Sequence, residues 1–429
     1  MKRSRNSVDW ITDVPVGWKV KPICRIASVD DDALSDDLDG LNDFRYVDIS
    51  SVDHIEGIKG AIIVQASEAP SRARRLARQG DVVVSTVRTY LKAVAEVTSE
   101  YSDCVFSTGF AVLRADRSEL SDGYLKWALL NENLIQAVEA HSEGLSYPAI
   151  NSSALVKLKL PVPPIQVQRG IVTFLDKATF HLDALVAKKT RFIELLREKR
   201  QALITQAVTK GLDPSVPMKD SGVEWLGEVP AHWDIVRGGS VLVEQRAKND
   251  PLRSDYYLSL MANIGIIPYA EKGDVGNKKP DDLTKCKMVS PGDFVINSMN
   301  YAIGSYGVSA YAGVCSPVYV VMRHRPEVID PKFMDLILSN PSYQNYAQSF
   351  GTGILDHRRA IGWDEIKMIR VPLPPLDEQA KIASWTITHR DRVDLLIAKT
   401  ERSIELLREH RTALITAAVT GKIDLRDAA

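Results

Sequence analysis

The sequence has few cysteines and no long apolar run. Only four of its 429 residues are cysteine, at positions 24, 104, 286 and 315, and none forms a CxxC pair. A disulfide framework or a zinc ribbon therefore has no support. The N-terminus lacks an apolar stretch of signal-peptide length, and no segment approaches the roughly 18 apolar residues of a membrane span. These absences predict a cytoplasmic chain without contact with a membrane.

Signatures of catalysis are also missing. The chain contains no GxxxxGK[ST] phosphate-binding loop, and its eight histidines form no HxxxH or HExxH pair, so neither nucleotide hydrolysis nor a metal site is predicted. "NPSY" at 340–343 imitates a methyltransferase motif but lies in a helical pattern. "FGTG" at 350–353 imitates a cofactor loop, but no apolar strand precedes it. The sequence therefore predicts a binding protein without catalytic residues.

Charge of either sign is not in excess. The chain has 54 basic and 55 acidic residues, a net charge of -1, so its total charge does not encode a general polyanion-binding surface. Any contact with nucleic acid must come from local clusters or from partners.

The chain does contain a long internal repeat. "RFIELLREKRQALITQAVT" from Arg191 recurs as "RSIELLREHRTALITAAVT" from Arg402, 211 residues later, and the match extends upstream to "LPVPPIQVQ" and "VPLPPLDEQ". A looser repeat relates "SVDWITDVPVGW" from Ser7 to "GVEWLGEVPAHW" from Gly222. A repeat with a period above 200 residues indicates duplication of a whole domain, not a solenoid.

Each conserved repeat predicts a long helix. A Pro-Pro pair precedes it, and a glycine follows it at Gly211 or Gly421, where glycine suits a helix C-cap. Apolar residues at helical spacing predict a coiled-coil seam. The predicted seam comprises Ile171, Leu175, Ala178, Leu182, Leu185, Phe192, Leu196 and Leu203, with Ile382, Val393, Leu396, Leu407 and Leu414 in the second copy. An amphipathic helix lying on its own domain is the alternative.

The regions between the repeats share a skeleton. "RQGDVVVSTVRTYLKAVAEV" from Arg78 and "SPGDFVINSMNYAIGSYGVS" from Ser290 each predict a turn, a strand, a polar loop and a second strand. Helical segments follow from Asp122 and Pro331, and each region closes with a glycine-bearing loop before its Pro-Pro pair. The predicted class is α+β, with two mixed α/β domains.

The predicted loops carry side chains suited to DNA. Arginine can contact guanine and phosphates, and asparagine can pair with adenine. A basic run from Arg72 to Arg78 is ordinarily a solvated face, but here it precedes an arginine- and tyrosine-bearing loop. The candidate DNA-binding residues of the first region are Arg72, Arg74, Arg75, Arg88, Tyr90, Lys92, Ser146, Tyr147 and Asn151. Those of the second are Asn297, Asn300, Tyr301, Thr352, His357, Arg358 and Arg359.

These motifs together resemble the specificity subunit of type I restriction-modification systems. "KDSGVEWLGEVPAHW", the "PLPPLDEQ" helix entry and the duplicated "IELLRE" helix carry the resemblance, which covers nearly the whole chain. It implies two target-recognition domains, at about residues 20–160 and 236–371, separated by two antiparallel helices that form a coiled coil with internal pseudo-two-fold symmetry. The corresponding segments are 1–160, 161–213, 214–371 and 372–429.

The resemblance also implies partners. Two copies of a methyltransferase subunit would dock on the helices and bind S-adenosylmethionine, restriction subunits with motor and nuclease activity would join them, and double-stranded DNA would be read at an asymmetric bipartite site. This chain itself is expected to bind no cofactor and no metal. A coiled-coil adaptor without DNA recognition is the alternative, although it leaves the arginine- and asparagine-bearing loops unexplained.

Overall fold

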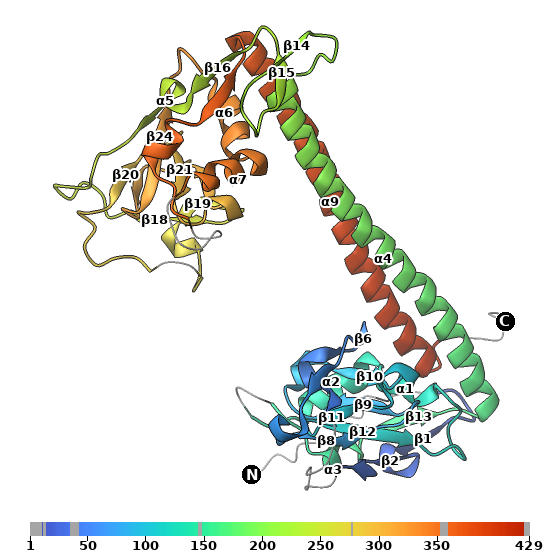
Figure 1. Cartoon of the computed structure of the whole chain (residues 1–429). Helices are drawn as coiled ribbons and strands as arrows, with labels where there is room; N and C mark the ends of the chain where they lie inside the picture. Colours follow the sequence, from blue (N-terminus) through green and yellow to red (C-terminus); the bar gives the residue numbers. More distant parts are fainter. Residues whose placement is uncertain are drawn as a thin grey trace. The chain divides into compact units, whose positions relative to one another are not determined.

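A computed structural model describes residues 11, 14–34, 43–144, 148–275, 278–351 and 359–423. The chain divides into two compact units, one of Met1–Thr190 with Glu401–Ala429 and the other of Arg191–Thr400. Each unit joins a globular α/β domain to parts of two long helices, α4 and α9 (Figure 1). The four segments expected from the sequence have different boundaries, because each unit contains helical residues from both copies of the repeat.

The two long helices have the predicted bounds. Helix α4 spans Ile165–Lys210 and helix α9 spans Leu376–Val419, and each begins directly after its Pro-Pro pair. Gly211 and Gly421 adopt φ angles of 72° and 74°, the left-handed region that glycine enters without a Cβ penalty. The prediction of two duplicated helices with glycine C-caps is confirmed.

The coiled-coil seam agrees with the predicted one in part. It includes the predicted Leu175, Leu182, Leu196 and Leu203 of α4 and Val393, Leu407 and Leu414 of α9. Leu185, Phe192 and Leu396 were placed in it, but their side chains are 42%, 47% and 47% exposed. Alternating steps of four and three residues along α4 instead pass through positions that are buried or half-buried. These positions are Leu175, Thr179, Leu182, Val186, Lys189, Ile193, Leu196, Arg200, Leu203 and Ala207, and each equivalent in α9 is 211 residues later.

One ion pair in each unit shows that the helices run antiparallel. In the first unit, Arg411 Nε lies 3.0 Å from Asp183 Oδ1, and in the second, Arg200 Nη1 lies 2.6 Å from Asp394 Oδ1. The repeat offset of 211 residues converts one pair into the other. From the first pair to the second, the residue number rises along α4 and falls along α9, so the two helices run in opposite directions. Each unit therefore has the same helix pairing.

The first globular domain contains two main sheets. Strands β10, β9, β12 and β2 form a four-stranded antiparallel sheet, and β3, β8, β11, β4 and β7 form a five-stranded sheet in which β11 and β4 are parallel. Smaller pairs are β1 with β13 and β5 with β6. The strands are β1 Lys19–Pro22, β2 Ala27–Val29, β3 Asp32–Ala33, β4 Phe44–Val47, β5 Val52–Asp53, β6 Gly57–Ile58, β7 Ile62–Val64, β8 Ala73–Leu76, β9 Val82–Ser85, β10 Val94–Glu96, β11 Val105–Ser107, β12 Phe110–Ala115 and β13 Lys159–Val162.

The second globular domain repeats part of this plan. Its largest sheet has the order β17-β24-β21-β22, and four strand pairs accompany it: β14-β15, β16-β25, β18-β19 and β20-β23. The strands are β14 Met218–Asp220, β15 Glu228–Pro230, β16 Asp234–Arg237, β17 Leu242–Glu244, β18 Leu258–Met261, β19 Gly265–Pro268, β20 Lys287–Val289, β21 Phe294–Asn297, β22 Tyr306–Val308, β23 Gly313–Cys315, β24 Tyr319–His324 and β25 Arg370–Leu373.

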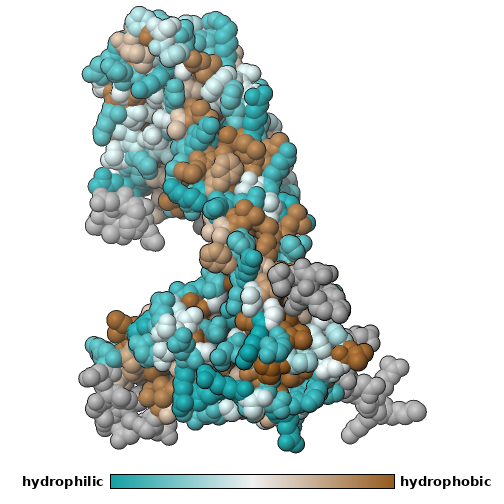
Figure 2. All heavy atoms as spheres, turned by 90° about the vertical axis from the view of Figure 1, so that its right-hand side faces the viewer, coloured by the Kyte–Doolittle hydropathy of each residue, from teal (hydrophilic) through white to brown (hydrophobic). Residues whose placement is uncertain are grey.

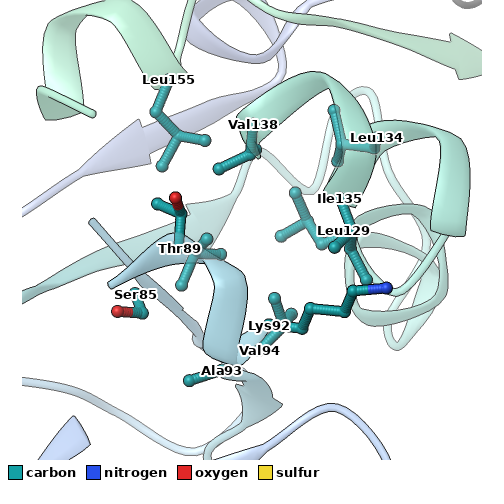
Figure 3. Close-up of a pocket in the computed structure, with 11 residues that line it drawn as sticks. Ser85, Thr89, Lys92, Ala93, Val94, Leu129, Leu134, Ile135, Val138 and Leu155 are labelled. Atoms are coloured by element: carbon teal, nitrogen blue, oxygen red, sulfur yellow. The ribbon is translucent and has the colours of Figure 1, made fainter. Parts of the chain in front are cut away.

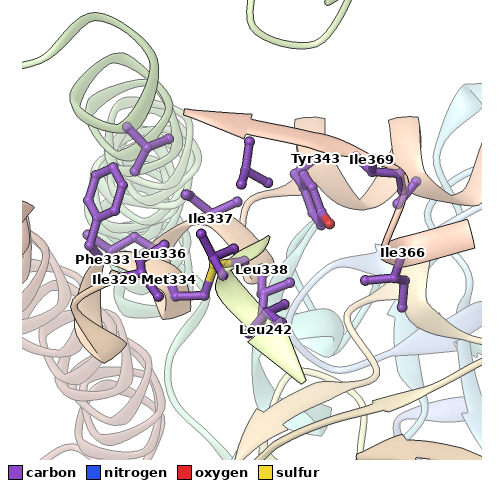
Figure 4. Close-up of a cluster of buried hydrophobic side chains, with 14 of the residues drawn as sticks. Leu242, Ile329, Phe333, Met334, Leu336, Ile337, Leu338, Tyr343, Ile366 and Ile369 are labelled. Carbon is purple, nitrogen blue, oxygen red and sulfur yellow. The ribbon is translucent and has the colours of Figure 1, made fainter. Parts of the chain in front are cut away.

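Short helices accompany the sheets in both units. They are α1 Tyr124–Leu129, α2 Glu132–Ala140 and α3 Ser152–Leu155 in the first unit, and α5 Gly238–Val241, α6 Pro331–Leu338, α7 Pro341–Ser349 and α8 Trp363–Ile366 in the second. Figure 4 shows Phe333, Ile337 and Leu338 packed with strand and helix residues in the second unit's core. That core continues onto both long helices through Val208 and Ile382. The predicted mixed α/β domains and paired helices are confirmed.

A buried glutamine fastens each globular domain to the start of a long helix. Gln379 is fully buried; its Oε1 accepts a hydrogen bond from Asp330 N at 2.7 Å, and its Nε2 donates to the carbonyls of Val328 and Pro374. Gln168, its equivalent in the repeat, makes the same three contacts with Ser121 N, Glu119 O and Pro163 O. An amide side chain is suited to this position because it both accepts and donates.

We expect Gln379→Ala to lower the free energy of unfolding by about 3 kcal/mol, since it leaves a buried N–H and buried carbonyls without partners. Chemical denaturation of the chain measures this. Gln168→Ala should cost a similar amount, whereas Gln166→Ala, at an exposed position of α4, should change stability by less than about 0.5 kcal/mol. Equal stability of all three variants would contradict the assignment.

Candidate nucleic-acid interface

The polar loop predicted in each half is a turn between two strands. In the first unit, residues 85–92, called turn 1, connect β9 to β10 and contain a single 3-10 turn at Thr89–Leu91. In the second, residues 297–304, called turn 2, connect β21 to β22 and contain a 3-10 turn at Tyr301–Ile303. The two turns occupy equivalent positions in the repeat, because an alignment of Gly80 with Gly292 also aligns the strands on either side of each turn.

A glycine turn with a buried aspartate leads into each strand. Asp81 and Asp293 accept hydrogen bonds from the backbone N–H groups of Arg78 and Ser290, each at 2.8 Å. Their carboxylates also bind the guanidinium groups of Arg114 and Arg323. The hydrogen bonds that Arg114 donates to Asp81 raise the pKa of Arg114, so this arginine stays charged. The start of each strand is therefore fixed by the same polar cluster.

The glycine-bearing closing loop of the first unit packs against turn 1. Ile150 N donates to Thr86 O at 2.8 Å, and Val87 forms an isolated β-bridge with Ala149. The Thr89 and Ser142 hydroxyls lie 2.8 Å apart. Two segments about 60 residues apart in the sequence are thus joined.

The second unit contains the equivalent contact. Ile361 N donates to Ser298 O at 3.0 Å, and Ile361 lies 211 residues after Ile150. Gln348 connects the two segments, since its Nε2 donates to Arg359 O and its Oε1 accepts from Ala302 N at 3.4 Å. Each unit therefore presents one strand-to-strand turn braced by one closing loop.

Four of the predicted residues are exposed on these paired segments. Arg88 and Tyr90 project from turn 1, Asn300 projects from turn 2, and Asn151 lies at the N-cap of α3 beside turn 1. Arg359 is half-buried and donates to Ser349 O. Ser146, Tyr147, Thr352, His357 and Arg358 lie outside the described residues.

The predicted basic run divides between two environments. Arg72 is exposed, and its carbonyl accepts from Thr108 N at the Thr108–Gly109 turn, which also binds Thr86 of turn 1. Arg74 is half-buried and donates to Ala73 O. Arg75 and Arg78 point to the acidic β2–β3 segment, where they form ion pairs with Asp30 and Asp32 at 2.8 and 3.0 Å.

Two predicted residues belong to the core instead. Tyr301 is fully buried, and its hydroxyl donates to Leu338 O at 2.7 Å. Burial holds the pKa of this phenol well above its usual range. Asn297 is also buried and accepts from Met299 N through its Oδ1. Both side chains shape turn 2 from inside, so we remove them from the candidate DNA contacts.

The structure adds exposed apolar residues that the sequence did not identify. Leu91 on turn 1 and Met299 and Ile303 on turn 2 have exposed side chains. Apolar side chains can contact the thymine methyl group, so these positions are compatible with base contacts. The sequence does not predict them, because arginine, asparagine and tyrosine are the residue types that indicated DNA contacts. An apolar residue on a predicted turn is the only sequence signal for them.

The β18–β19 hairpin rests on turn 2. Asn263 N, at the tip of the hairpin, donates to Gly304 O at 2.9 Å. Beside it, Gly307 on β22 packs against the backbone of the hairpin; an added Cβ would lie 2.8 Å from Gly265 Cα and 2.9 Å from Ile266 N. Glycine is required at position 307 because two backbones approach each other there.

We expect Gly307→Ala to destabilise the second unit by about 2 kcal/mol, because the obstructing atoms are backbone atoms that cannot rotate away. The midpoint of chemical denaturation tests this. Gly60→Ala is the control, since a Cβ at position 60 meets nothing within 4 Å. A Gly307→Ala variant as stable as the Gly60→Ala variant would show that the hairpin is not held by this contact.

Among the residues that the structure describes, no cluster of three or more histidine, cysteine, aspartate or glutamate side chains could hold a metal ion. Within the same part of the chain, no helix is both long enough and apolar enough to span a membrane.

Comparison with known proteins gives relatives of one kind. No family model matches the sequence. The chain is 22% identical to the MjaX specificity subunit assigned to a type I restriction enzyme of Methanocaldococcus jannaschii, over 97% of this chain and 96% of that protein. It is 21% identical to the MjaVIII specificity subunit of the same organism over 75% of each chain, and 23% identical to the EcoBI specificity subunit of Escherichia coli over 58% of this chain and 55% of that one.

Solved structures share the fold. A chain from a structure described as the basis of complex assembly and conformational transition of the type I R-M system matches with a TM-score of 0.72 and 20% identity, over 96% of this chain and 100% of that one. The HsdS subunit of Thermoanaerobacter tengcongensis matches with a TM-score of 0.51 and 22% identity, over 96% and 99%. The chain therefore shares the fold of these structures, and over nearly its full length its sequence is similar to a type I restriction enzyme specificity subunit, the family that its motifs resemble.

Proposed function

We propose that this chain is a DNA-recognition subunit that reads the two halves of an asymmetric bipartite site, one half with each unit. The observation that carries the proposal is a pair of equivalent turns with unlike exposed side chains. Arg88 and Tyr90 of turn 1 correspond to Asn300 and Ala302 of turn 2. Arginine prefers guanine and asparagine prefers adenine in the major groove. Two equivalent frames with different contact residues would read different bases.

The chain supplies recognition and not catalysis. Its relatives are named as specificity subunits of restriction enzymes, and we propose that it assembles with methyltransferase and restriction subunits. S-adenosylmethionine would bind to the methyltransferase partner. The alternative of an adaptor without DNA recognition does not account for the similarity to specificity subunits.

The long helices offer a surface for these partners. Apolar side chains lie exposed along α4 and α9, where Figure 2 shows hydrophobic surface. Exposed apolar groups on a helix favour a protein contact. They include Leu185 and Leu195 on α4 and their equivalents Leu396 and Leu406 on α9. Because the same residues occur twice, we propose that two copies of the methyltransferase subunit dock at equivalent positions.

Reconstitution tests the proposed function. The chain is co-expressed with a type I methyltransferase subunit from its own genome, and methyl transfer to DNA is measured for the complex and for each component. We expect sequence-specific transfer only with the complex, and no binding of S-adenosylmethionine by this chain in calorimetry. The methyltransferase alone modifying the same sites would contradict the proposal, as would calorimetric binding of the cofactor to this chain.

A further inference from the structure

Turn 1 has left-handed backbone at two residues that are not glycine. Arg88 and Lys92, which flank its 3-10 turn, adopt φ angles of 50° and 51°. The position equivalent to Lys92 in turn 2 is Gly304, which has φ of 83°. A side chain in this region strains the backbone, so surrounding contacts must hold it there. Lys92 therefore occupies a position at which the other copy of the domain uses glycine.

The Lys92 side chain points into the protein. Its Nζ lies 2.7 Å from Glu132 Oε1, and the side chains of both residues are less than one third exposed. Its carbon chain lines a small apolar cavity of about 20 Å³ with Thr89, Leu129 and Val138 (Figure 3). Glu132 Oε1 also accepts from Gln136 Nε2 at 3.2 Å. The ammonium group of Lys92 is thus engaged at the N-terminus of α2.

That helix terminus is attached to the long helices. Glu132 N donates to Thr416 Oγ1 of α9 at 3.3 Å. In the second unit, Thr205 of α4, which lies 211 residues before Thr416, accepts from Asn340 Nδ2 at 3.0 Å at the N-terminus of α7. Each unit therefore connects a long helix, through a threonine, to the helix beside its turn.

The contact between the turn and its neighbouring helix differs between the units. In the second unit, Tyr301 of turn 2 is buried beside Tyr343, with ring centroids 6.5 Å apart, and donates to Leu338 O. Turn 1 has Thr89 at the position of Tyr301, and α2 has Leu134 at the position of Tyr343. Turn 1 lacks this aromatic packing. The Lys92–Glu132 ion pair joins it to the N-terminus of α2, and the Thr89–Ser142 hydroxyl contact joins it to the residues after the C-terminus of that helix.

We propose that Lys92 is a positioning residue for recognition of one half-site. Through Glu132 and Thr416, it fixes turn 1 relative to the long helices, so that Arg88 and Tyr90 are presented in one orientation. This role rests on the proposed function of DNA recognition, and it replaces the direct DNA contact expected of Lys92 from the sequence.

The test is a charge exchange in the assembled methyltransferase complex. Lys92→Glu, Glu132→Lys and the double variant are compared for methylation of the cognate site and of sites with one altered base in either half. We expect each single variant to lose on the order of tenfold in discrimination at one half-site, and the double variant to recover most of it. Discrimination at the other half-site should be unchanged.

Two further measurements separate positioning from a phosphate contact. Loss of a phosphate contact makes the fall of log affinity with log salt concentration less steep, by about 0.9 in slope. Loss of a positioning contact leaves the slope unchanged. Lys92→Gly should keep the left-handed backbone without strain, and should therefore be better folded than Lys92→Ala in thermal unfolding. Lys126→Ala is the matched control, because Lys126 pairs with Glu96 at 3.3 Å with similar burial but outside turn 1.

A reduced salt slope in Lys92→Glu, without recovery in the double variant, would overturn the proposal and make Lys92 a DNA contact. Unchanged discrimination in folded Lys92→Gly and Lys92→Glu complexes would overturn it as well. Failure of the proposed function is distinguishable, because the unaltered complex would then show no sequence discrimination at either half-site.

Discussion

Inserting seven residues after Arg191 and seven after Arg402 is expected to lengthen the non-specific spacer between the two half-sites without changing either sequence. One heptad adds about 10 Å to an α-helix, or roughly three base pairs of DNA. DNA turns by roughly 100° over three base pairs, so twisting or partial slippage reduces the expected change to about one or two base pairs. Sequencing of methylated sites in cells that carry the variant measures the spacer directly.

The antiparallel register provides the control for this variant. Paired insertions lengthen both helices at facing positions. Both ion pairs, Asp183 with Arg411 and Arg200 with Asp394, can therefore still form in one register. An insertion in α4 alone shifts the register of one ion pair relative to the other by seven residues, so the two pairs cannot both form in one continuous seam. We expect that single insertion to abolish specific methylation. Full activity of the paired variant at the original spacing would contradict a spacing role for the helices.

Substitutions in the two turns are expected to damage different halves of the recognition site. Arg88→Ala in the complex should cost about 1–3 kcal/mol of discrimination in one half-site, if the guanidinium contacts a base. Asn300→Ala should have a comparable effect in the other half-site. Both side chains are exposed at equivalent positions, so each variant is the other's control. Methylation rates on DNA with single altered bases in each half measure both effects.

Two results would contradict the assignment of one turn to each half-site. A uniform loss across all sites, with a lower salt slope, would show that Arg88 contacts phosphate and not a base. Loss of discrimination in both halves from one substitution would show that the turns do not act in separate units.

The helical part of the fold could be predicted because its signals are local and occur twice. The Pro-Pro entries, the glycine caps and the repeat itself fix the bounds of α4 and α9, and the structure confirms them. The seam was less predictable. Thr179, Lys189 and Arg200 occupy seam positions, while the apolar Leu185 and Phe192 lie beside the seam and are exposed. Polarity alone therefore identified Leu175, Leu182, Leu196 and Leu203 correctly, but it missed the polar seam positions and added exposed apolar ones.

The candidate site could be predicted only in part. The alignment of the two halves located both turns and both closing loops, and the hydrogen bonds of Ile150 and Ile361 show that these segments meet. Side-chain direction could not be predicted from residue type. Tyr301 faces the core because α6 offers the Leu338 carbonyl, and Lys92 faces inward because α2 offers Glu132. Both partners are distant in the sequence.

The central claim is that two unlike turns on a duplicated frame read the two halves of one DNA site. Sequencing the methylated bases made by the complex of this chain with its methyltransferase tests it most directly. We predict a single motif with two different defined parts, separated by a non-specific spacer of constant length. A contiguous motif, a palindrome or methylation without a motif would contradict the account.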